Sequence, residues 1–376
     1  MKHLGRVSGL ALAGLLLSSV AVFAGPKTVS GPGADPECFK PWSNTTKYFQ
    51  WPKKQGPYRI AVANGFVGNT WRIQMIKTAK AFAELPEIKK DIKEFKVVST
   101  GTDVAAQLGA MEDFINQGYD AIIANVVSPD GFDRIIRLAD KNNVVVVPFD
   151  NVLDTDKVMQ INEDQKEMGR MSAEWLLKET GKTSGDILEV RGLPGNSVDR
   201  DRHVGFREVM EKAPNKFNIT EVVGNWDTGT SQKVTADALA VHGHFDGVFT
   251  QGGSDGTVQA MMDAHHPFVP MSGEGENEYR KQIAEHWKQG LKGMSYGQSP
   301  ALVAIAMKAA ISALKGNVMP QLISIPIPVA TYKDLKPGVN YWPDLNVGFF
   351  ADNQFKPCGV DFTAPQIMAQ SEKNTQ

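Results

Sequence analysis

Residues 185–208 read GDILEVRGLPGNSVDRDRHVGFRE, and this stretch contains one complete strand-to-helix transition. The apolar run at 187–190 predicts a short buried strand, which the glycines and proline of residues 192–195 end. Asn196 or Ser197 can then cap a helix, because a short polar side chain accepts a hydrogen bond from the free N–H groups of the first turn. A strand, a glycine-rich loop and a helix form half of a βαβ unit.

Arg200 lies in the first turn of that predicted helix. Ligands of open α/β sheets bind at the carboxyl ends of the strands, so an arginine here can direct its planar set of donors at hydroxyl or carboxylate oxygens. The alternative is that Arg200 is one charge of a solvent-exposed helix start. The patterns in the rest of the chain distinguish a ligand-binding Arg200 from an exposed one.

Strand and helix patterns alternate along the remaining sequence. Apolar runs predict strands at 59–63, 95–99, 121–125, 144–149, 220–224, 248–251, 268–271 and 294–296, with an extended stretch at 323–329. Amphipathic patterns predict helices at 70–85, 103–117, 130–141, 166–180, 230–241, 278–288 and 301–314, and another that ends near His265. Valine runs such as 144–147 are apolar on both faces, as in parallel strands covered by helices. Two successive series of this kind predict an α/β fold with two similar lobes, each a parallel sheet flanked by helices.

Length and composition are consistent with this fold. A chain of 376 residues is too long for one ordinary hydrophobic core, which predicts two domains. With 42% hydrophobic residues, 22% charged residues and a net charge of -2, the chain is typical of a globular protein. The absence of basic character argues against nucleic acid as a partner.

Residues 1–24 have the pattern of an export signal. Lys2 and Arg6 precede an apolar run at 10–20, and residues 22–24 offer small side chains at the cleavage positions. The apolar run is too short to span a bilayer comfortably. We therefore expect cleavage after Ala24 and a soluble protein in the periplasm.

The two cysteines stand near the two ends of the mature chain. Cys38 lies in an expected irregular leader at 25–57, and Cys358 lies in a Pro- and aromatic-rich tail that begins after Thr331 and is expected to cross both lobes. An even pair in an oxidising compartment predicts a disulfide between them. Two separate buried thiols are the alternative.

Polar side chains gather where the predicted strands end. They lie at 64–69, Asn125, 150–151, 191–200, 225–227, 251–255, Glu274 and Gln298. The set consists of carboxylates, amides, an arginine and tryptophans. Carboxylates and arginine make paired hydrogen bonds to neighbouring hydroxyls, while an aromatic face covers the apolar side of a sugar ring. The pattern indicates a carbohydrate pocket between two lobes.

Other motifs point to no chemistry. Gly181-Lys182-Thr183 lacks the first glycine of a phosphate loop, since position 176 is Leu, and it precedes its strand. The glycine-rich residues 252–256 are read as a turn at the pocket rim rather than as a phosphate cradle. The histidine pairs at 242/244 and 265/266 do not have the spacing that places two metal ligands on one helix face. No serine stands in a nucleophile-elbow pattern, and we expect neither catalysis, metal nor cofactor.

Over residues 58 to 330 the chain resembles the type I periplasmic binding proteins of sugar ABC importers, in particular their ribose-binding branch. Asn69-Thr70-Trp71 is similar to the loop after the family's first strand, which implies that Asn69 contacts ligand and Trp71 stacks on it. Val147-Pro148-Phe149-Asp150 is similar to the strand that ends in a hydroxyl-binding Asp. Asn151 follows, where the family usually has Arg.

The second half carries the family's other motifs. Gly195-Asn196-Ser197 through Gly205-Phe206 is similar to its second-lobe signature, whose first arginine, here Arg200, is the ligand-binding fork. Trp226 stands at the second stacking aromatic, Glu274 replaces a shorter Asp, and Gln298 matches a glutamine close to the hinge. The expected Asn of a Gln-Asn-Asp motif is missing, so Asp255 or the loop backbone is expected to replace it.

The resemblance implies a three-segment hinge, with crossings near 161–163, Gln298 and 326–328. It divides the chain into a signal peptide (1–24), an irregular leader (25–57), an N-terminal lobe (58–162 plus 299–326), a C-terminal lobe (163–298 plus 327–345) and a C-terminal tail (346–376). The implied function is to bind a neutral monosaccharide, cyclitol or sugar alcohol and deliver it, as a monomer, to an ABC permease. The alternative is a sensor that presents its closed form to a chemoreceptor or membrane kinase.

Overall fold

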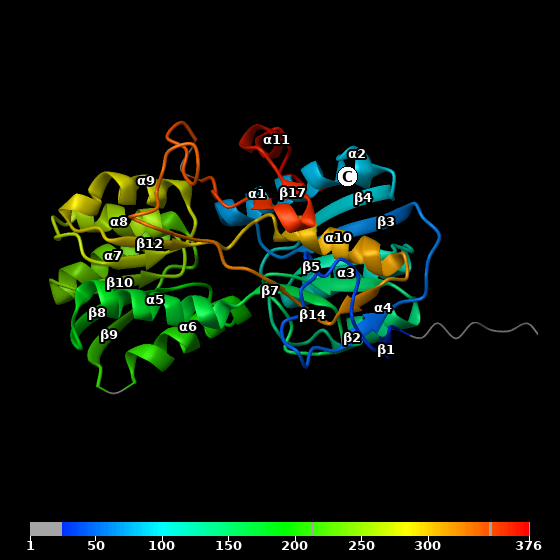
Figure 1. Ribbon diagram of the computed structural model, residues 1–376, viewed down its shortest axis with the longest axis horizontal. Coiled ribbons are helices and arrows are strands. Elements are labelled where there is room, and N and C mark those ends of the chain that lie inside the picture. Colours follow the sequence, from blue (N-terminus) through cyan, green and yellow to red (C-terminus); the bar gives the residue numbers. More distant parts are fainter. Residues whose placement is uncertain (1–24, 213, 346–347, 376) are drawn as a thin grey trace, which may run out of the picture.

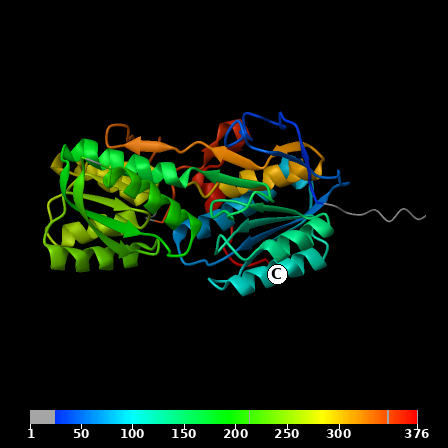
Figure 2. The same ribbon diagram turned by 90° about the horizontal axis from the view of Figure 1, so that it is seen from below.

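The computed structural model describes residues 25–212, 214–345 and 348–375, and in it the chain forms two lobes that lie side by side along the long axis (Figures 1 and 2). Residues 1–24, where the sequence predicts the export signal, lie outside the described residues. Within the described ranges, no helix combines the length and the apolar character needed to cross a membrane.

The first lobe is built on a four-stranded parallel sheet. Its strands, in spatial order, are β4 (Ile92–Ser99), β3 (Tyr58–Asn64), β5 (Ala121–Asn125) and β6 (Val145–Pro148). Ile60 and Val62 share a core with α1 (Thr70–Ala83) and α10 (Leu302–Leu314), whereas Ala61 and Ala63 pack with α3 (Val104–Asn116) and α4 (Asp133–Lys141). Successive residues of a strand point to opposite faces, so both faces of this sheet are buried. The short α2 (Pro86–Lys89) precedes β4.

The second lobe repeats this plan with a six-stranded sheet. The spatial order is β15 (Val329–Thr331), β12 (Gly293–Tyr296), β11 (Met271–Gly273), β10 (Gly247–Thr250), β8 (Ser184–Arg191) and β9 (Lys216–Val223), and only β15 is antiparallel to its neighbour. One face packs on α5 (Gln165–Thr180) and α6 (Ser197–Met210). The other packs on α7 (Thr228–His242), α8 (Ser254–Asp263) and α9 (Asn277–His286), which a short 3-10 helix, η1 (Trp287–Gln289), follows. The predicted two-lobed α/β class is confirmed.

The stretch at 185–208 folds as the strand β8, a loop and the helix α6 (Figure 1). Asn196 is the cap: its backbone is extended, and its side chain accepts a hydrogen bond from the N–H of Val198 at 2.9 Å. Helix α6 therefore begins at Ser197, which fixes the direction in which each later side chain points.

Two paired strands join the lobes. In β7 (Gln160–Glu163) and β14 (Leu322–Ile325) the chain runs parallel, with Ile161 opposite Ile323. The expected extended stretch at 323–329 is interrupted between β14 and β15, because Pro326 and Pro328 lack the N–H that a continuous ladder needs. The third passage, from β12 to α10, contains Gln298.

The leader is more ordered than the sequence analysis expected. β1 (Lys27–Val29) pairs with β2 (Tyr48–Gln50), which also pairs with β13 (Val318–Pro320), and all pairs are antiparallel. Pro-, Gly- and Ser-rich composition predicted an irregular segment, but Phe49 and Trp51 enter the first-lobe core. Burial of these aromatic side chains outweighs the weak local preference of the surrounding residues.

Beyond β15 the tail crosses the second lobe and returns to the first. Tyr332 and Leu335 pack on the second-lobe core, whereas Phe362 and Ile367 belong to the first-lobe core. Its elements are β16 (Gln354–Phe355), η2 (Lys356–Cys358), β17 (Val360–Asp361) and α11 (Ala364–Met368), and α11 lies against α1 (Figure 1).

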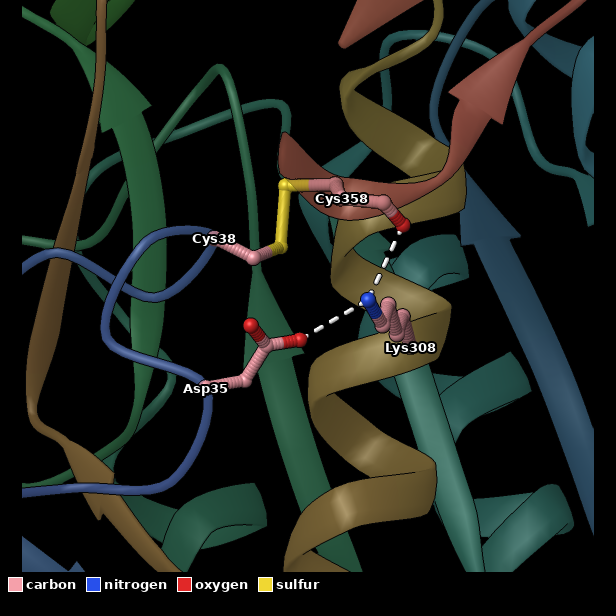
Figure 3. Close-up of a disulfide and its surroundings, with 4 residues drawn as sticks. All are labelled: Asp35, Cys38, Lys308 and Cys358. Atoms are coloured by element: carbon pink, nitrogen blue, oxygen red, sulfur yellow. Dashed lines mark hydrogen bonds and ion pairs between the residues drawn. A yellow bond between two sulfur atoms is a disulfide. The ribbon is translucent and has the colours of Figure 1, made fainter. Parts of the chain in front are cut away.

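A disulfide between Cys38 and Cys358 joins the leader to the tail (Figure 3). Both half-cystines are buried. Lys308 of α10 reinforces the junction, because its ammonium donates to Asp35 Oδ2 and to the carbonyl of Cys358, each at 2.9 Å. The two ends of the chain are thus fastened to each other and to the same helix.

Replacing both cysteines by serine should destabilise the protein. The bridge spans 320 residues of sequence, so its loss restores much conformational freedom to the unfolded chain, and the free energy of unfolding should fall by about 2–5 kcal/mol. Chemical denaturation with and without reductant measures the change. Reductant should destabilise the wild type and leave the double variant unaffected; equal stability of oxidised and reduced wild type would contradict the expectation.

Candidate functional site

A cavity lies between the lobes, at the carboxyl ends of their strands. Eight of the nine residues that the sequence analysis proposes as ligand contacts line it: Asn69, Trp71, Asp150, Asn151, Trp226, Asp255, Glu274 and Gln298. Arg200 does not. These residues come from six separate segments that follow strands, and only the folding of both lobes brings them together.

Asn69 and Trp71 are held by the start of α1. Asn69 is its N-cap, and its Oδ1 accepts the N–H of Arg72 at 2.9 Å. The indole Nε1 of Trp71 donates to the carbonyl of Gln298 at 2.8 Å. Because Gln298 lies in a passage between the lobes, this bond ties the aromatic wall of the cavity to the hinge.

Asp150 is a buried carboxyl group, only 4% exposed. Its backbone is left-handed, with φ of 61°, and its Oδ2 accepts from the amides of Asn125 at 3.1 Å and of Asn151 at 3.0 Å. Burial raises the pKa of Asp150 to about 6, although Arg72 and Arg202 act in the opposite direction. Its charge at neutral pH is therefore held by amides and by cations on both lobes.

Arg200 is the one predicted contact that the structure places elsewhere. Its side chain is 43% exposed and pairs with Asp201 and with Asp154, where Nη2 lies 3.0 Å from Oδ1. The helix start explains the error. Val198 and Arg202 are four residues apart and share the face that lines the cavity, whereas Arg200, two residues from either, points to the opposite side.

Arg202 is the arginine that lines the cavity, and it is fully buried. Its Nε donates to Gln165 Oε1 at 2.9 Å, its Nη1 to the carbonyl of Gln251 at 2.7 Å and to Glu274 Oε1 at 2.5 Å, and its Nη2 to Gln298 Oε1 at 2.8 Å. The guanidinium also lies over the ring of Tyr296. Protein groups therefore already occupy most of its donors.

Arg72 is a cavity residue that the sequence analysis missed. It is 2% exposed, donates through Nη1 to Asn64 Oδ1 at 2.7 Å and lies over the ring of Phe66. Burial lowers the pKa of Arg72 to about 10, against the effect of Asp150. The sequence contains a signal for this role, because Arg72 stands in the first turn of the helix after the first strand, just as Arg200 stands in the first turn after its own strand.

The second lobe lines the cavity with three carboxyl groups. Glu274 is paired with Arg202, and Asp255 Oδ1 accepts the hydroxyl of Thr228 at 2.9 Å. Glu276, also missed, accepts the N–H of Gly253 at 2.8 Å and the hydroxyl of Ser254 at 2.8 Å. Burial, together with Glu274 and Asp255, raises the pKa of Glu276 to about 8. The cavity thus contains more acids than bases.

The indole ring of Trp226 packs directly against Gly192, which has no side chain. Asn225 and Trp226 both have left-handed backbones, and a Cβ on Gly192 would lie 2.2 Å from the indole Nε1. Any side chain at position 192 would displace the ring. The glycine-rich loop after β8 therefore makes room for an aromatic wall of the second lobe.

Four buried polar atoms of cavity residues have no hydrogen-bond partner within the described residues: Arg72 Nη2, Asn151 Oδ1, Trp226 Nε1 and Gln298 Nε2. Buried polar groups are almost always paired in folded proteins, so four unpaired atoms around one cavity call for a partner. Three are donors and one is an acceptor. A ligand with several hydroxyl groups, each both donor and acceptor, can satisfy all four.

One carboxylate–histidine cluster lies outside the cavity. Glu189, His203 and Glu221 present ligand atoms close together. However, Arg207 already pairs with both glutamates, through Nε to Glu189 at 2.9 Å and through Nη2 to Glu221 at 3.1 Å. An ion-pair network accounts for the cluster.

Comparisons with known proteins agree with this geometry. A family model described as a periplasmic binding protein domain matches residues 60–317. Among curated proteins, the chain is 25% identical over 252 residues to the ribose import binding protein RbsB of Bacillus subtilis (strain 168), which covers 66% of this chain and 80% of the relative. It is 28% identical over 168 residues to the galactofuranose-binding protein YtfQ of Escherichia coli (strain K12), covering 44% of this chain and 51% of the relative.

Solved structures share the two-lobed fold. A galactofuranose-binding protein superposes with a TM-score of 0.67 at 20% identity, covering 74% of this chain and 95% of the other. The binding protein of the arabinose ABC transporter from Shewanella sp. ANA-3 superposes with a TM-score of 0.66 at 25% identity, covering 73% and 92%. Since the family model spans most of the chain and the fold is shared, the chain belongs to the periplasmic binding protein family and has a solute-binding role.

Proposed function

We propose that this protein is the periplasmic solute-binding component of an ABC importer, and that it closes on a neutral monosaccharide, cyclitol or sugar alcohol. The observation that carries the proposal is the set of four unpaired polar atoms around the cavity, on Arg72, Asn151, Trp226 and Gln298. Trp71 and Trp226 add the apolar surface that the C–H face of a sugar ring requires. The cavity holds and orients a ligand, and the proposal assigns it no catalytic step.

The charges of the cavity favour a neutral ligand. Arg202 is already paired with Glu274, and Arg72 faces the carboxylate of Asp150, while Asp255 has no cation beside it in the cavity. Glu276, whose pKa is raised to about 8 by burial and by the neighbouring acids, already shows how unfavourable a further negative charge is here. A carboxylate or phosphate on the ligand would add a negative charge to this group at a cost of several kcal/mol. Hydroxyl groups instead donate to the acids and accept from Arg72.

The relatives support a sugar and leave room for one other than ribose. Proteins named for ribose and galactofuranose match in sequence, and a solved relative is described as bound to L-arabinofuranose. Asn151 stands where the ribose-binding pattern has arginine, and Arg72 supplies a guanidinium from another direction. We therefore propose that the ligand is a sugar or polyol whose hydroxyl groups are arranged differently from those of ribose.

The remaining assignments follow from the same proposal. Export and cleavage after Ala24 would release a monomer into the periplasm, where the ligand-closed form meets the permease. A sensor that presents the closed form to a chemoreceptor or membrane kinase uses the same cavity. Deletion of a neighbouring permease would abolish uptake in the first case and leave a sensory response in the second.

The mature protein, screened against pentoses, hexoses, sugar alcohols and inositols, should melt at a higher temperature with at least one neutral ligand. A ligand that binds only the native state raises stability, by about 2.7 kcal/mol at 100 times its Kd. Matched sugar acids and sugar phosphates serve as controls and should give no shift. A shift confined to charged ligands would refute the neutral class, and no shift with any sugar would refute the proposed function.

Replacing Arg72 by methionine should weaken binding of that ligand by at least about 2 kcal/mol, because a charged hydrogen bond is lost. Arg200→Met is the matched control, since it also removes an arginine from the first helical turn. Arg200 lies outside the cavity and pairs with Asp154 of the first lobe, so its loss should cost no more than an exposed ion pair, about 1 kcal/mol or less. Titration calorimetry compares the two, and equal effects would contradict the assignment.

Affinity should fall as the pH drops below about 6. Burial raises the pKa of Asp150 to about 6 in the free protein, and ligand hydroxyls bond best to the ionised carboxylate, so bound ligand lowers that pKa. Binding is then independent of this group above pH 7 and weakens below pH 6, by up to tenfold per pH unit. Asp150→Asn should bind more weakly at pH 7.5 and lose this dependence; an unchanged profile in the variant would assign it to another group.

A further inference from the structure

A short segment of the tail, residues 349–353, lies beyond the matched family region, which ends at residue 317, and contacts both lobes. On the second lobe, the N–H of Asn277 donates to the carbonyl of Phe349 at 2.8 Å, and the N–H of Ala351 donates to the carbonyl of Gly275 at 3.0 Å. The buried Arg280 forms an ion pair with Asp352. The segment therefore lies beside the loop that contains Glu274 and Glu276 and is hydrogen-bonded to it.

The same segment is fastened to the first lobe by Gln74. This side chain, 3% exposed and one turn after Trp71 in α1, accepts the N–H of Phe350 at 2.8 Å and donates to its carbonyl at 3.1 Å. It also donates to Asn353 Oδ1 at 2.8 Å. A single glutamine thus satisfies both backbone groups of Phe350, and the segment joins the lobes at a fourth place besides the three passages of the main fold.

Covalent structure keeps the segment in reach. Cys358 lies five residues after Asn353, and its disulfide to Cys38 and its carbonyl bond to Lys308 hold this part of the tail on the first lobe (Figure 3). Phe349 and Phe350 are both buried in the first-lobe core. The position of residues 349–353 is therefore fixed at its start by the burial of Phe349 and Phe350 and after its end by the disulfide of Cys358.

Phe350 also lines the cavity between the lobes. Gln74 engages both its N–H and its carbonyl, so the position of this cavity-lining residue is fixed through its backbone. We propose that Phe350 is a specificity-determining residue: the tail closes one side of the ligand cavity with an aromatic ring and so limits the size of the sugar. This inference rests on the proposed function and adds to it a wall that the matched family region does not supply.

The test uses pairs of sugars that differ by one hydroxymethyl group: D-ribose and D-allose, L-arabinose and D-galactose, D-xylose and D-glucose. Titration calorimetry gives the pentose-to-hexose affinity ratio of each pair for the wild type, Phe350→Ala and Phe350→Leu. Space for one extra carbon in a pocket changes affinity by about 10- to 200-fold. For the pair that the wild type binds, we expect Phe350→Ala to shift the ratio at least tenfold toward the hexose, and Phe350→Leu to shift it the same way by less.

Phe362→Ala is the control, because Phe362 is equally buried in the tail's part of the core and does not line the cavity. It should lower the melting temperature and leave the ratio unchanged. An unchanged ratio in both Phe350 variants, or an equal shift in Phe362→Ala, would overturn the inference while wild-type sugar binding still stands. If Phe350→Ala does not fold, Phe350→Leu decides alone. Absence of any sugar binding by the wild type would instead refute the proposed function.

Discussion

The buried guanidinium of Arg202 connects the parts on which the site depends. It bonds to Gln165 at the start of α5, to the carbonyl of Gln251 after β10, to Glu274 after β11 and to Gln298 between the lobes. A charge taken out of water needs such partners, and removing one member of a buried pair leaves the other uncompensated at a cost of about 3–5 kcal/mol. The four segments are consequently held in one arrangement, and two of the partners, Glu274 and Gln298, line the cavity.

Gln298 extends this network into the first lobe. Its side-chain oxygen accepts from Arg202 and Gln165, and its backbone carbonyl accepts the indole N–H of Trp71. A ligand that bonds to its remaining amide donor would therefore touch a residue that lies in the hinge and contacts both lobes. Differential contact of this kind is what a ligand needs in order to favour the closed arrangement of two lobes over the open one.

The tail changes this two-lobed clamp in a way that the family pattern does not describe. Arg280 and Asp352 hold it on the second lobe, while Gln74 and the Cys38–Cys358 disulfide hold it on the first. Arg200 and Asp154 form another bridge between the lobes at the surface. The surface pair is screened by water and salt and contributes little, whereas Gln74 and Arg280, which hold the tail, are buried. Relative motion of the lobes must therefore preserve, or break together, the hydrogen bonds of residues 349–353.

Much of this could be predicted from the amino-acid sequence alone, because it depends on local patterns. Apolar runs and amphipathic periods placed the strands and helices, Asn196 or Ser197 was expected to cap α6, and the order of polar loops indicated Asp150, Trp226 and Gln298 as cavity residues. Strand ends of one parallel sheet meet at one edge whatever the details of packing, so Trp226 and Gln298 lie at one edge of the second-lobe sheet and Asp150 at one edge of the first-lobe sheet. The two-lobed class followed from the repeated strand–helix series.

Only the tertiary structure decided which arginines enter the cavity and what the tail does. One residue of helix turns a side chain by about 100°, so choosing Arg202 over Arg200 required the start of α6 at Ser197 and the face that packs on β8. Glu276 and Phe350 belong to the site through burial and through hydrogen bonds between distant segments, such as that between Gln74 and Phe350 across 276 residues. Such contacts leave no periodic signal in the sequence, because they arise when segments far apart in the chain pack against each other.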